Sequence, residues 1–338
     1  MGLKVAINGL GRIGRCLFRL IIPELVKGNI SLLVINSPAD VSTLVHLLCY
    51  DSTYGRFEYS LEVQGNDLIV AGKHIRVLHE RDPSCLPWSE LMIDCVLECS
   101  GKFNDSSMIH VKSGAKKVLV SAPMKNANAS NTIVRGVNDE DLDISLSVYS
   151  VGSCTTNCLL PVLKFLNIGL NIESAFFTTI HAYTNDQNLL DNNHKSSLRR
   201  ARTASLSMVP TTTGASKILK HLIPDLYGKV QGTALRVPTH NVSVLDLVVS
   251  TSDDSISDTN QLKEFIVDNI DGQNDLVLNY ERVPLVSIDY NGNHFSGVFD
   301  LEETYFVSSK MFRVLVWYDN EFAFSKRMLE VMYLLFKK

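Results

Sequence analysis

The segment Asn8–Gly14, which reads Asn-Gly-Leu-Gly-Arg-Ile-Gly, constrains the fold of this chain more than any other sequence feature. The apolar run Leu3–Ile7 precedes it, and Arg15–Glu24 follows with apolar residues at helical spacing. Glycines spaced G-x-G-x-x-G between a strand and a helix let the backbone approach a pyrophosphate, and free N–H groups at the helix start favour its charge. The sequence therefore predicts a dinucleotide-binding βαβ unit, with a tight turn that binds no ligand as the alternative.

Two different strand textures indicate two domains. Further buried runs at Ser31–Ile35, Asp94–Glu98 and Lys117–Val120 predict a doubly wound sheet in the first half. Later β-rich runs are suited to a largely antiparallel sheet; they are Ala175–Ile180, Ala234–Val237, Val242–Ser250 and Arg313–Trp317. We expect an α/β protein with a Rossmann dinucleotide-binding domain and an α+β catalytic domain. The expected bounds are 1–153, completed by a C-terminal helix at 319–338, and 154–318.

Composition narrows the class of partner. The chain has 338 residues and a net charge of −4, so it offers no basic surface for nucleic acid or an anionic membrane. No apolar run is long enough to span a bilayer, and its seven cysteines are scattered and odd in number, which indicates a cytoplasmic protein with reduced thiols. Cys154 and Cys158 are separated by three residues, which does not match a zinc or thioredoxin-like site, so we expect no metal.

The end of the second expected strand bears on the choice of cofactor. An acidic residue at this place usually accepts hydrogen bonds from the adenosine ribose, but here the strand ends Val-Ile-Asn-Ser-Pro and Ser37 occupies the acidic position. Without a carboxylate nothing at this place would repel a 2′-phosphate. No Lys or Arg follows in sequence until Arg56, so a cation for that phosphate would have to come from elsewhere in the fold. We expect NAD or NADP, with NADP slightly favoured.

Cys154 is the candidate nucleophile. Small hydroxylated residues surround it and a helix is expected to begin near Thr155, and a helix N-terminus stabilises a thiolate. The competing interpretation is a buried structural cysteine. His181 follows the strand Ala175–Ile180, where an imidazole could lower the thiol pKa and exchange a proton with a substrate oxygen. A separation of 27 residues cannot show that the two side chains touch.

Several downstream residues are suited to anions. Thr184 follows His181, the run Thr211–Gly214 precedes a helical stretch, and Arg236 lies in a strand. Hydroxyls, backbone N–H groups and an arginine are what phosphate oxygens require, although each could instead be a cap or an ion pair. The connection Leu189–Val209 is longer than a loop that only joins two elements, which indicates a role in an interface or in cofactor binding.

Seven blocks occur in order: Asn8–Arg15, Ser153–Asn157, His181–Gln187, Leu198–Arg202, Pro210–Ala215, Ala234–Pro238 and Trp317–Glu321. With them the chain resembles the glyceraldehyde-3-phosphate dehydrogenase family essentially from end to end, and Cys-Thr-Thr-Asn-Cys at 154–158 is highly specific. The resemblance implies reversible phosphorylating oxidation of glyceraldehyde 3-phosphate to 1,3-bisphosphoglycerate. It implies that Cys154 forms a thioester, that His181 is its activating base and that hydride passes to NAD or NADP.

The resemblance also implies binding roles. It implies cofactor contacts at Arg12, Ile13, Arg81, Ser121 and Asn320. These join the turn glycines Gly9, Gly11 and Gly14, and Ser37, as the expected cofactor-binding residues. The positions that bind the attacking inorganic phosphate in the family are matched by Ser153, Thr155, Thr213 and Gly214. Those that bind the phosphate of the sugar substrate are matched by Thr184 and Arg236, and Arg200 resembles a further anion contact. The loop Leu189–Val209 resembles one that lines a neighbouring subunit's cofactor site, which implies a homotetramer.

Departures from the family pattern leave alternatives. The family usually has Asn-Asp where this chain has Asn36-Ser37, and forms without that acid resemble the NADP-using, biosynthetic-direction branch. Val77–Arg81 and Val283–Tyr290 look somewhat like erythrose-4-phosphate dehydrogenase, in which water replaces phosphate as the acyl acceptor. The retained residues of Thr211–Gly214 favour the phosphorylating enzyme. A non-catalytic binding protein on the same scaffold is the rival of another class, and the intact Cys154 argues against it.

Overall fold

The computed structural model describes residues 2–272, 277–308 and 310–337. The chain divides into two compact units, each built around its own sheet. Unit 1 comprises Met1–Ile133, Asp139–Ser153 and Ser325–Lys338, and unit 2 comprises Val134–Asn138 and Cys154–Phe324. Residues 319–324, expected to belong with the first domain, are therefore grouped with unit 2.

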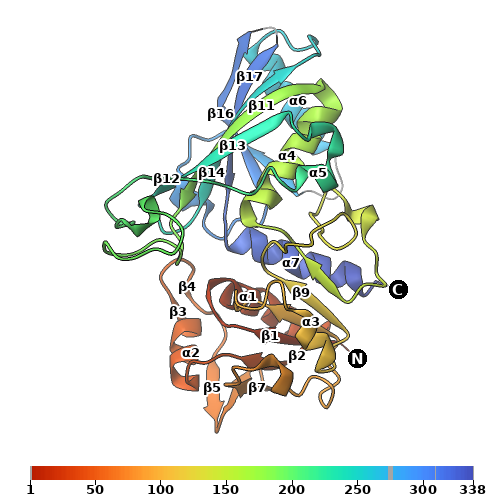
Figure 1. Cartoon of the computed structure of the whole chain (residues 1–338), viewed down its shortest axis with the longest axis vertical. Coiled ribbons are helices and arrows are strands. Elements are labelled where there is room, and N and C mark those ends of the chain that lie inside the picture. Colours follow the sequence, from red (N-terminus) through yellow and green to blue (C-terminus); the bar gives the residue numbers. More distant parts are fainter. Residues whose placement is uncertain (1, 273–276, 309, 338) are drawn as a thin grey trace. The chain divides into compact units, whose positions relative to one another are not determined.

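Unit 1 has a sheet with the strand order β10-β9-β8-β1-β2-β7-β6-β5, of which Figure 1 labels β9, β1, β2, β7 and β5. The strands from β10 to β7 are parallel, whereas β6 and β5 return as an antiparallel meander at one edge. The strands are β1 (Leu3–Asn8), β2 (Ile30–Asn36), β3 (Tyr50–Asp51), β4 (Gly55–Arg56), β5 (Leu61–Gln64), β6 (Asp67–Val70), β7 (Lys73–Leu78), β8 (Cys95–Glu98), β9 (Lys117–Val120) and β10 (Val148–Ser150). The helices are α1 (Arg12–Val26), α2 (Val41–Cys49) and α3 (Met108–Lys112), with short 3₁₀ turns η1 (Pro83–Cys85) and η2 (Asp139–Asp141).

The glycine turn between β1 and α1 is sterically fixed. Gly9 has φ +98°, and a Cβ there would lie 2.5 Å from the backbone nitrogen of Ser100. A Cβ on Gly14 would lie 2.1 Å from the carbonyl oxygen of Gly9, so the first turn of α1 can pack against the loop only without a side chain. A Cβ on Gly11 would meet nothing within 4 Å, so the turn is open at this position.

Buried polar side chains tie together the carboxyl ends of the central strands. Asn8 is the register partner of both Asn36 and Glu98, and its amide nitrogen donates to Glu98 Oε2 at 2.5 Å. Asn36 donates to Asn8 Oδ1 at 2.7 Å, and His110 lies 2.9 Å from the same Glu98 oxygen. Trp88 Nε1 can only donate, so its 3.0 Å bond makes His110 Nδ1 the acceptor and leaves His110 Nε2 to donate to Glu98. This network fixes the strand ends from which the loops emerge.

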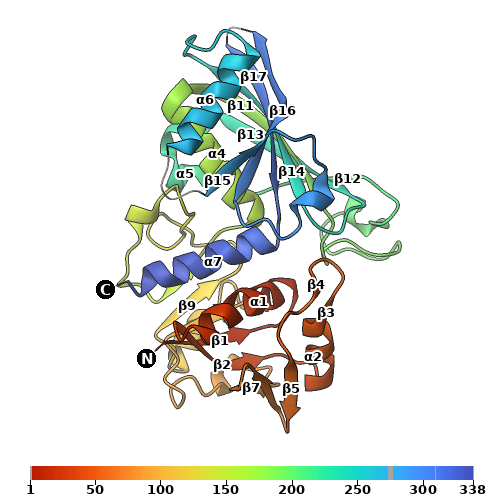
Figure 2. The ribbon, with the colours of Figure 1, turned by 180° about the vertical axis from the view of Figure 1, so that it is seen from behind.

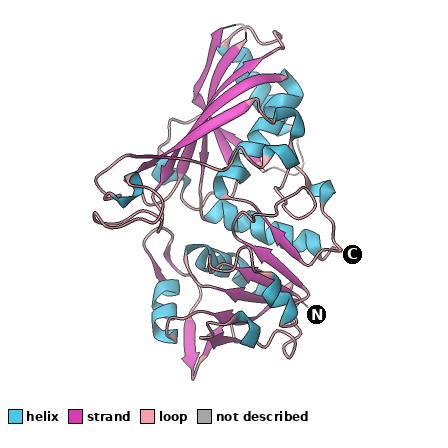
Figure 3. Ribbon diagram, in the orientation of Figure 1, coloured by secondary structure: helices cyan, strands magenta, loops and turns pink. Residues whose placement is uncertain are grey.

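Unit 2 has a second sheet with the order β12-β13-β11-β14-β17-β16-β15. Only the pairs β11/β13 and β15/β16 are parallel, so the expectation of a largely antiparallel second sheet, and the α/β fold class with it, is confirmed (Figure 3). Its helices are α4 (Cys154–Leu170), α5 (Leu219–Leu222) and α6 (Thr259–Asp271), with 3₁₀ turns η3 (Arg199–Ala201), η4 (Pro224–Leu226) and η5 (Ser287–Tyr290). Its strands are β11 (Ile172–Ala182), β12 (Val209–Thr211), β13 (Val230–Val237), β14 (Ser243–Thr251), β15 (Leu278–Glu281), β16 (Gly297–Ser308) and β17 (Met311–Tyr318).

A tight reversal connects α4 to β11. Asn171 has φ +49°, its N–H donates to the Asn167 carbonyl at 3.0 Å, and the Asn167 side chain accepts from the Ile172 N–H at 2.9 Å. An asparagine tolerates this left-handed conformation at a helix end. The strand therefore returns along the helix that precedes it, and Figure 2 shows β11 and α4 side by side. The start of α4 and the end of β11 lie at the same end of this pair.

Some element bounds differ from the expectations. Helix α4 begins at Cys154 itself, and the C-terminal helix α7 (Phe322–Leu335) begins three residues after the expected start at 319. The meander β5 to β7 and the strand β16 were not expected, because their short or charged segments give weak periodicity. Among the described residues no helix is both long and apolar enough to cross a bilayer.

The glycine turn gives a stability prediction. Gly14→Ala should lower the free energy of unfolding of unit 1 by about 1–3 kcal/mol, because the added methyl group overlaps the Gly9 carbonyl and the backbone must shift. Urea unfolding followed by circular dichroism measures the change. Gly11→Ala is the matched control, since its methyl group meets open space; a loss as large as that of Gly14→Ala would contradict the explanation.

Candidate active site

Cys154 and His181 are in contact. The Sγ atom of Cys154, the first residue of α4, lies 3.4 Å from Nε2 of His181, the second-last residue of β11. The reversal at Asn171 explains the contact, because a helix and a strand that run in opposite directions bring these two ends together. The structure thus supplies the proximity that a sequence separation could not.

Arg236 completes the group through the register of two parallel strands. His181 of β11 is the direct partner of Arg236 of β13, so their side chains emerge on the same face. Arg236 Nη1 lies 2.6 Å from His181 Nδ1 and 2.8 Å from the Ala182 carbonyl oxygen. A cation is therefore held beside the imidazole and, through it, close to the thiol.

The surroundings of His181 keep its ring neutral. Its Nδ1 lies 2.7 Å from the Ala182 carbonyl oxygen, which only accepts, and 2.6 Å from Arg236 Nη1, which only donates, so the two contacts favour opposite tautomers. Burial and then the Arg236 charge lower the pKa of His181 to about 3. The ring is therefore neutral near neutral pH, and in the tautomer with its proton on Nδ1 it can accept the thiol proton at Nε2.

Opposing influences act on the thiol. Burial raises the pKa of Cys154, whereas the charge of Arg236 and hydrogen bonds from Thr155 lower it. From the sequence alone, the helix start and the imidazole are expected to favour the thiolate. In the structure burial outweighs the groups that favour the anion, and the neutral ring of His181 adds no charge.

Tyr318 is a member of the site that sequence reasoning missed. Its hydroxyl lies 3.1 Å from Thr155 Oγ1 and 2.7 Å from Thr179 Oγ1, and its ring meets that of His181 edge-on with centroids 6.0 Å apart. All of these groups are buried, so the tyrosine ties β17 to α4 and β11 beneath the reacting pair. It lies in the Trp317–Glu321 block, and that position was the available signal.

Arg236 has capacity left for an anion. It forms no ion pair with a carboxylate among the residues that the structure describes, and its buried Nε–H has no hydrogen-bond partner there. Burial lowers the pKa of its guanidinium, which still stays charged at neutral pH because the ordinary pKa of arginine lies far above 7. An unpaired buried donor is costly, so an incoming phosphate oxygen would relieve that cost.

The other expected anion residues form a network beside Arg236. Arg200 donates to Thr211 Oγ1 from Nε at 2.8 Å and from Nη2 at 2.6 Å, and it pairs with Asp186 at 2.7 Å. Gln187 links this pair to Thr184, because its side-chain oxygen accepts from the Thr184 N–H at 2.9 Å and its amide lies 3.1 Å from Asp186. Sequence reasoning gave no role to Asp186 or Gln187, although both lie in the block that starts at His181.

The four residues expected to bind the attacking phosphate have different surroundings from one another. Thr155 is only 5% exposed, and its hydroxyl is turned to Tyr318. Ser153 directly precedes Cys154 in the chain, and Gly214 leaves open space where a Cβ would be. Thr213 Oγ1 accepts from the Ala215 N–H at 3.2 Å in the turn that precedes the short helix α5.

Unit 1 gathers the other expected cofactor residues at the carboxyl edge of its parallel strands. The glycine turn follows β1, Ser37 follows β2, Arg81 lies three residues past β7 and Ser121 follows β9. Helix α1 starts without a side-chain cap and without an acidic residue in its first turn, so nothing in the turn competes with a pyrophosphate for its N–H groups. Arg12 pairs with Asp51 at 2.5 Å and lies over the Tyr54 ring, and Ile13 is half-buried.

Asn320 belongs to unit 2. Its side-chain oxygen accepts from Ser243 Oγ at 3.0 Å, and the same hydroxyl accepts from the Ala182 N–H at 3.1 Å. Asn320 is therefore linked to the strand end that carries His181.

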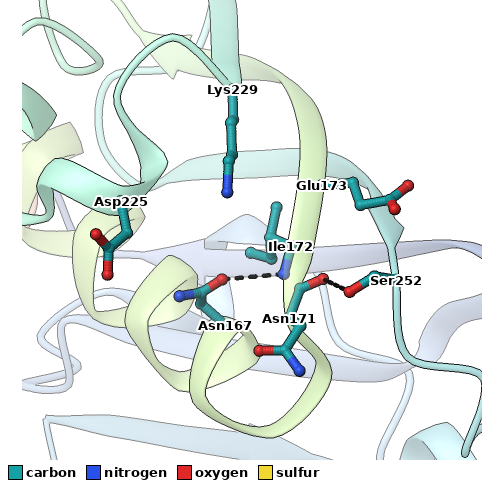
Figure 4. A pocket seen from close by; sticks show the side chains of 7 residues that line it. All are labelled: Asn167, Asn171, Ile172, Glu173, Asp225, Lys229 and Ser252. Carbon is teal, nitrogen blue, oxygen red and sulfur yellow. Dashed lines mark hydrogen bonds between the residues drawn. The ribbon is translucent and has the colours of Figure 1, made fainter.

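A pocket of about 570 Å³ lies at the other end of α4 (Figure 4). The side chain of Lys229 points toward Asn167, near the reversal that joins α4 to β11. Asn167 is 13 residues along the helix from Cys154, a distance of about 20 Å at 1.5 Å per residue. A substrate held in this pocket could not reach the sulfur, so the pocket is separate from the candidate active site.

Comparison with known proteins assigns the chain to a family. Residues 3–106 match the family model described as the NAD binding domain of glyceraldehyde 3-phosphate dehydrogenase, and residues 153–320 match that of its C-terminal domain. The chain is 45% identical over 337 residues to glyceraldehyde-3-phosphate dehydrogenase 2 of Bacillus subtilis (strain 168), covering 98% of this chain and 96% of that protein.

The chain belongs to the glyceraldehyde 3-phosphate dehydrogenase family. Two similar relatives carry the same name: 42% identity over 335 residues for the protein of Staphylococcus aureus (strain MRSA252) and 43% over 334 residues for that of Staphylococcus epidermidis (strain ATCC 12228 / FDA PCI 1200). Each alignment covers 98% of this chain and 95% of the relative. The family's NAD-binding domain model falls on unit 1, which supports use of NAD or NADP.

The charge of Arg236 gives a prediction for thiol reactivity. Alkylation of Cys154 by iodoacetamide should speed up as pH rises through the thiol pKa, because the thiolate is the reactive form. Arg236→Gln removes a positive charge that lowers this pKa, so the midpoint of its alkylation profile should lie at higher pH than in the parent. Mass spectrometry of the Cys154 peptide measures the rates. Arg202→Gln is the control, since that exposed arginine pairs with Asp191; an equal shift there would contradict the local effect.

Proposed function

We propose that this chain catalyses the reversible phosphorylating oxidation of glyceraldehyde 3-phosphate to 1,3-bisphosphoglycerate. The observation that carries the proposal is the 3.4 Å contact between Cys154 Sγ and His181 Nε2, with Arg236 at the neighbouring register position. Family membership supports the substrate and the reaction class. The catalytic residues are Cys154 and His181.

The first step uses the neutral pair. His181 Nε2 accepts the thiol proton as the Cys154 sulfur adds to the aldehyde carbon. The ring then passes that proton to the former aldehyde oxygen, so that a hemithioacetal forms on the sulfur and the imidazole is neutral again. Arg236 stabilises the negative sulfur as the proton leaves it. The imidazole then takes the hydroxyl proton of the hemithioacetal when the carbon is oxidised, which leaves a thioester on Cys154.

A bound nicotinamide dinucleotide supplies the oxidation by accepting the hydride. The open glycine turn and the uncapped start of α1 fit its pyrophosphate. Inorganic phosphate attacks the thioester carbon, the C–S bond breaks and the acyl phosphate leaves. Ser153, Thr155, Thr213 and Gly214 are assigned to this phosphate. Thr184 and Arg236, with Arg200 beside them, are assigned to the phosphate of the sugar, and the unpartnered Nε–H of Arg236 supports the latter assignment.

The features of β2 favour NADP over NAD. Ser37 follows this strand where an acidic residue would repel a 2′-phosphate.

All seven cysteines are free, which supports a reducing compartment such as the cytoplasm.

The proposed assembly is a homotetramer. The connection 189–209 exposes five large apolar side chains, and Leu198 and Leu206 are 91% and 85% exposed. Exposed apolar residues concentrated in one segment are typical of a surface that a partner covers.

Initial rates test the reaction. With glyceraldehyde 3-phosphate and NADP or NAD, cofactor reduction should depend on inorganic phosphate, because phosphate is the proposed acyl acceptor. Absorbance at the wavelength of the reduced nicotinamide measures it. Erythrose 4-phosphate without phosphate is the matched arm. Faster turnover of the tetrose, unaffected by phosphate, would favour the hydrolytic sister enzyme, and no reduction with either sugar would favour a binding protein.

Cys154→Ser should lower kcat by about a thousandfold or more, because an alcohol is a far weaker nucleophile than a thiolate. The same assay measures it, with a thermal melt to show that the variant is folded. Cys85→Ser is the control, since Cys85 is exposed in unit 1. A Cys154→Ser variant that kept most of the rate would exclude the proposed nucleophile.

The assembly proposal has its own test. Leu198→Asp combined with Leu206→Asp should shift the protein from tetramer to smaller species in sedimentation velocity, because buried carboxylates would disfavour the interface. Ile144→Asp, at another exposed apolar position, should leave the mass unchanged. Identical sedimentation of the parent and the double variant would remove this loop from the interface.

A further inference from the structure

The corner that would receive the adenosine ribose is built from two neighbouring strands. In a dinucleotide-binding sheet, the ribose C2′ substituent lies at the carboxyl end of the second strand, which is β2 here. β7 runs parallel to β2 with Asn36 opposite Leu78, so the residues after Leu78 emerge at the same edge. Ser37 N–H donates to the Leu78 carbonyl at 2.9 Å, and Asn36 exchanges two bonds of 2.9 Å with the backbone of Glu80. The position of His79 at this corner is therefore fixed from both sides.

His79 is the side chain that this corner presents to solvent. Ser37 is only 5% exposed, whereas His79 is exposed. His79 Nδ1 lies 2.9 Å from the Ser37 carbonyl oxygen. A carbonyl only accepts, so Nδ1 carries the proton and Nε2 is the atom available to a ligand.

The carboxylates of Glu80 and Asp82, which follow His79, accept hydrogen bonds from residues of their own segment. Glu80 Oε1 accepts from the N–H groups of Arg81 at 2.7 Å and Asp82 at 2.9 Å. Asp82 Oδ1 in turn accepts from Ser84 N–H and Oγ at 2.9 and 2.8 Å. The segment thus offers an incoming group the imidazole of His79 and, two residues on, the guanidinium of Arg81.

We propose that His79 meets the C2′ substituent of the adenosine ribose and sets the preference of this chain between NAD and NADP. Neutral Nε2 accepts a hydrogen bond from the 2′-hydroxyl of NAD. Protonated Nε2 instead donates to the 2′-phosphate of NADP, a charge-assisted bond that needs the imidazolium. The inference deepens the proposed function and rests on it. It also supplies, from another strand, the cation that the sequence after Ser37 lacks.

The test compares kcat/KM with NADP and with NAD in the same preparation. His79→Ala should lower the NADP-to-NAD ratio of kcat/KM by about tenfold or more, because losing the charge-assisted bond to the 2′-phosphate costs more than losing the neutral hydrogen bond to the 2′-hydroxyl. His79→Lys, which keeps a cation, should hold the ratio within about threefold of the parent at pH 7. His74→Ala is the matched control, because His74 is an exposed histidine on β7 itself. A ratio of rates is insensitive to partial unfolding.

The lysine variant separates a direct contact from a structural role. A cation at residue 79 can restore the preference for NADP only if that residue meets the 2′-phosphate. Dissociation constants of the two dinucleotides, measured without sugar phosphate, should change in the same order as the ratios of kcat/KM.

The outcomes are distinguishable. Turnover by the parent with an unchanged ratio in His79→Ala, or a ratio in His79→Lys as low as that of His79→Ala, would overturn this inference alone. A parent chain that reduces neither dinucleotide would overturn the proposed function, and the assignment of His79 with it.

Discussion

The reversal at Asn171 is the constraint on which the rest of unit 2 depends. It returns β11 along α4, and so brings the first residue of the helix to the end of the strand. The parallel pairing of β11 and β13 then adds Arg236 without any further loop, because register alone places it beside His181. A reactive sulfur, an imidazole and a guanidinium are thus positioned by regular secondary structure, which holds side chains more rigidly than loops do.

Arg236 connects the electrostatics of this group. It acts on Cys154 and His181 in opposite senses: the same positive charge lowers the pKa of the thiol, which favours its anion, and lowers the pKa of the imidazole, which disfavours its cation. Burial disfavours the charged form of both, so the free site holds a neutral pair with a cation beside it. An arrangement of this kind suits a nucleophile that becomes charged only as it reacts, when the neighbouring cation has most effect.

The sequence predicted much of this architecture, for physical reasons that can be named. The glycine spacing at Asn8–Gly14 predicted the first βαβ unit, because only glycine fits where a Cβ would overlap the backbone. The end-to-end resemblance led to Cys154, His181 and Arg236. Sequence reasoning did not find Tyr318 or His79, since the importance of each depends on a neighbour from a distant element. It also expected a thiolate, because the cost of burial cannot be judged without knowing what surrounds the sulfur.

Surface turns usually tolerate insertions and deletions, since few contacts depend on their length. The turn at Asn171 differs, because the helix before it and the strand after it carry the two halves of one reacting pair. Adding one residue would slide the strand by about 3.3 Å against the helix, and displacements near 1 Å can already cost about a hundredfold in rate. The Asn171 turn lies about 25 Å from Cys154, judged by the helical rise. Its length must nevertheless be kept as precisely as the position of the nucleophile itself.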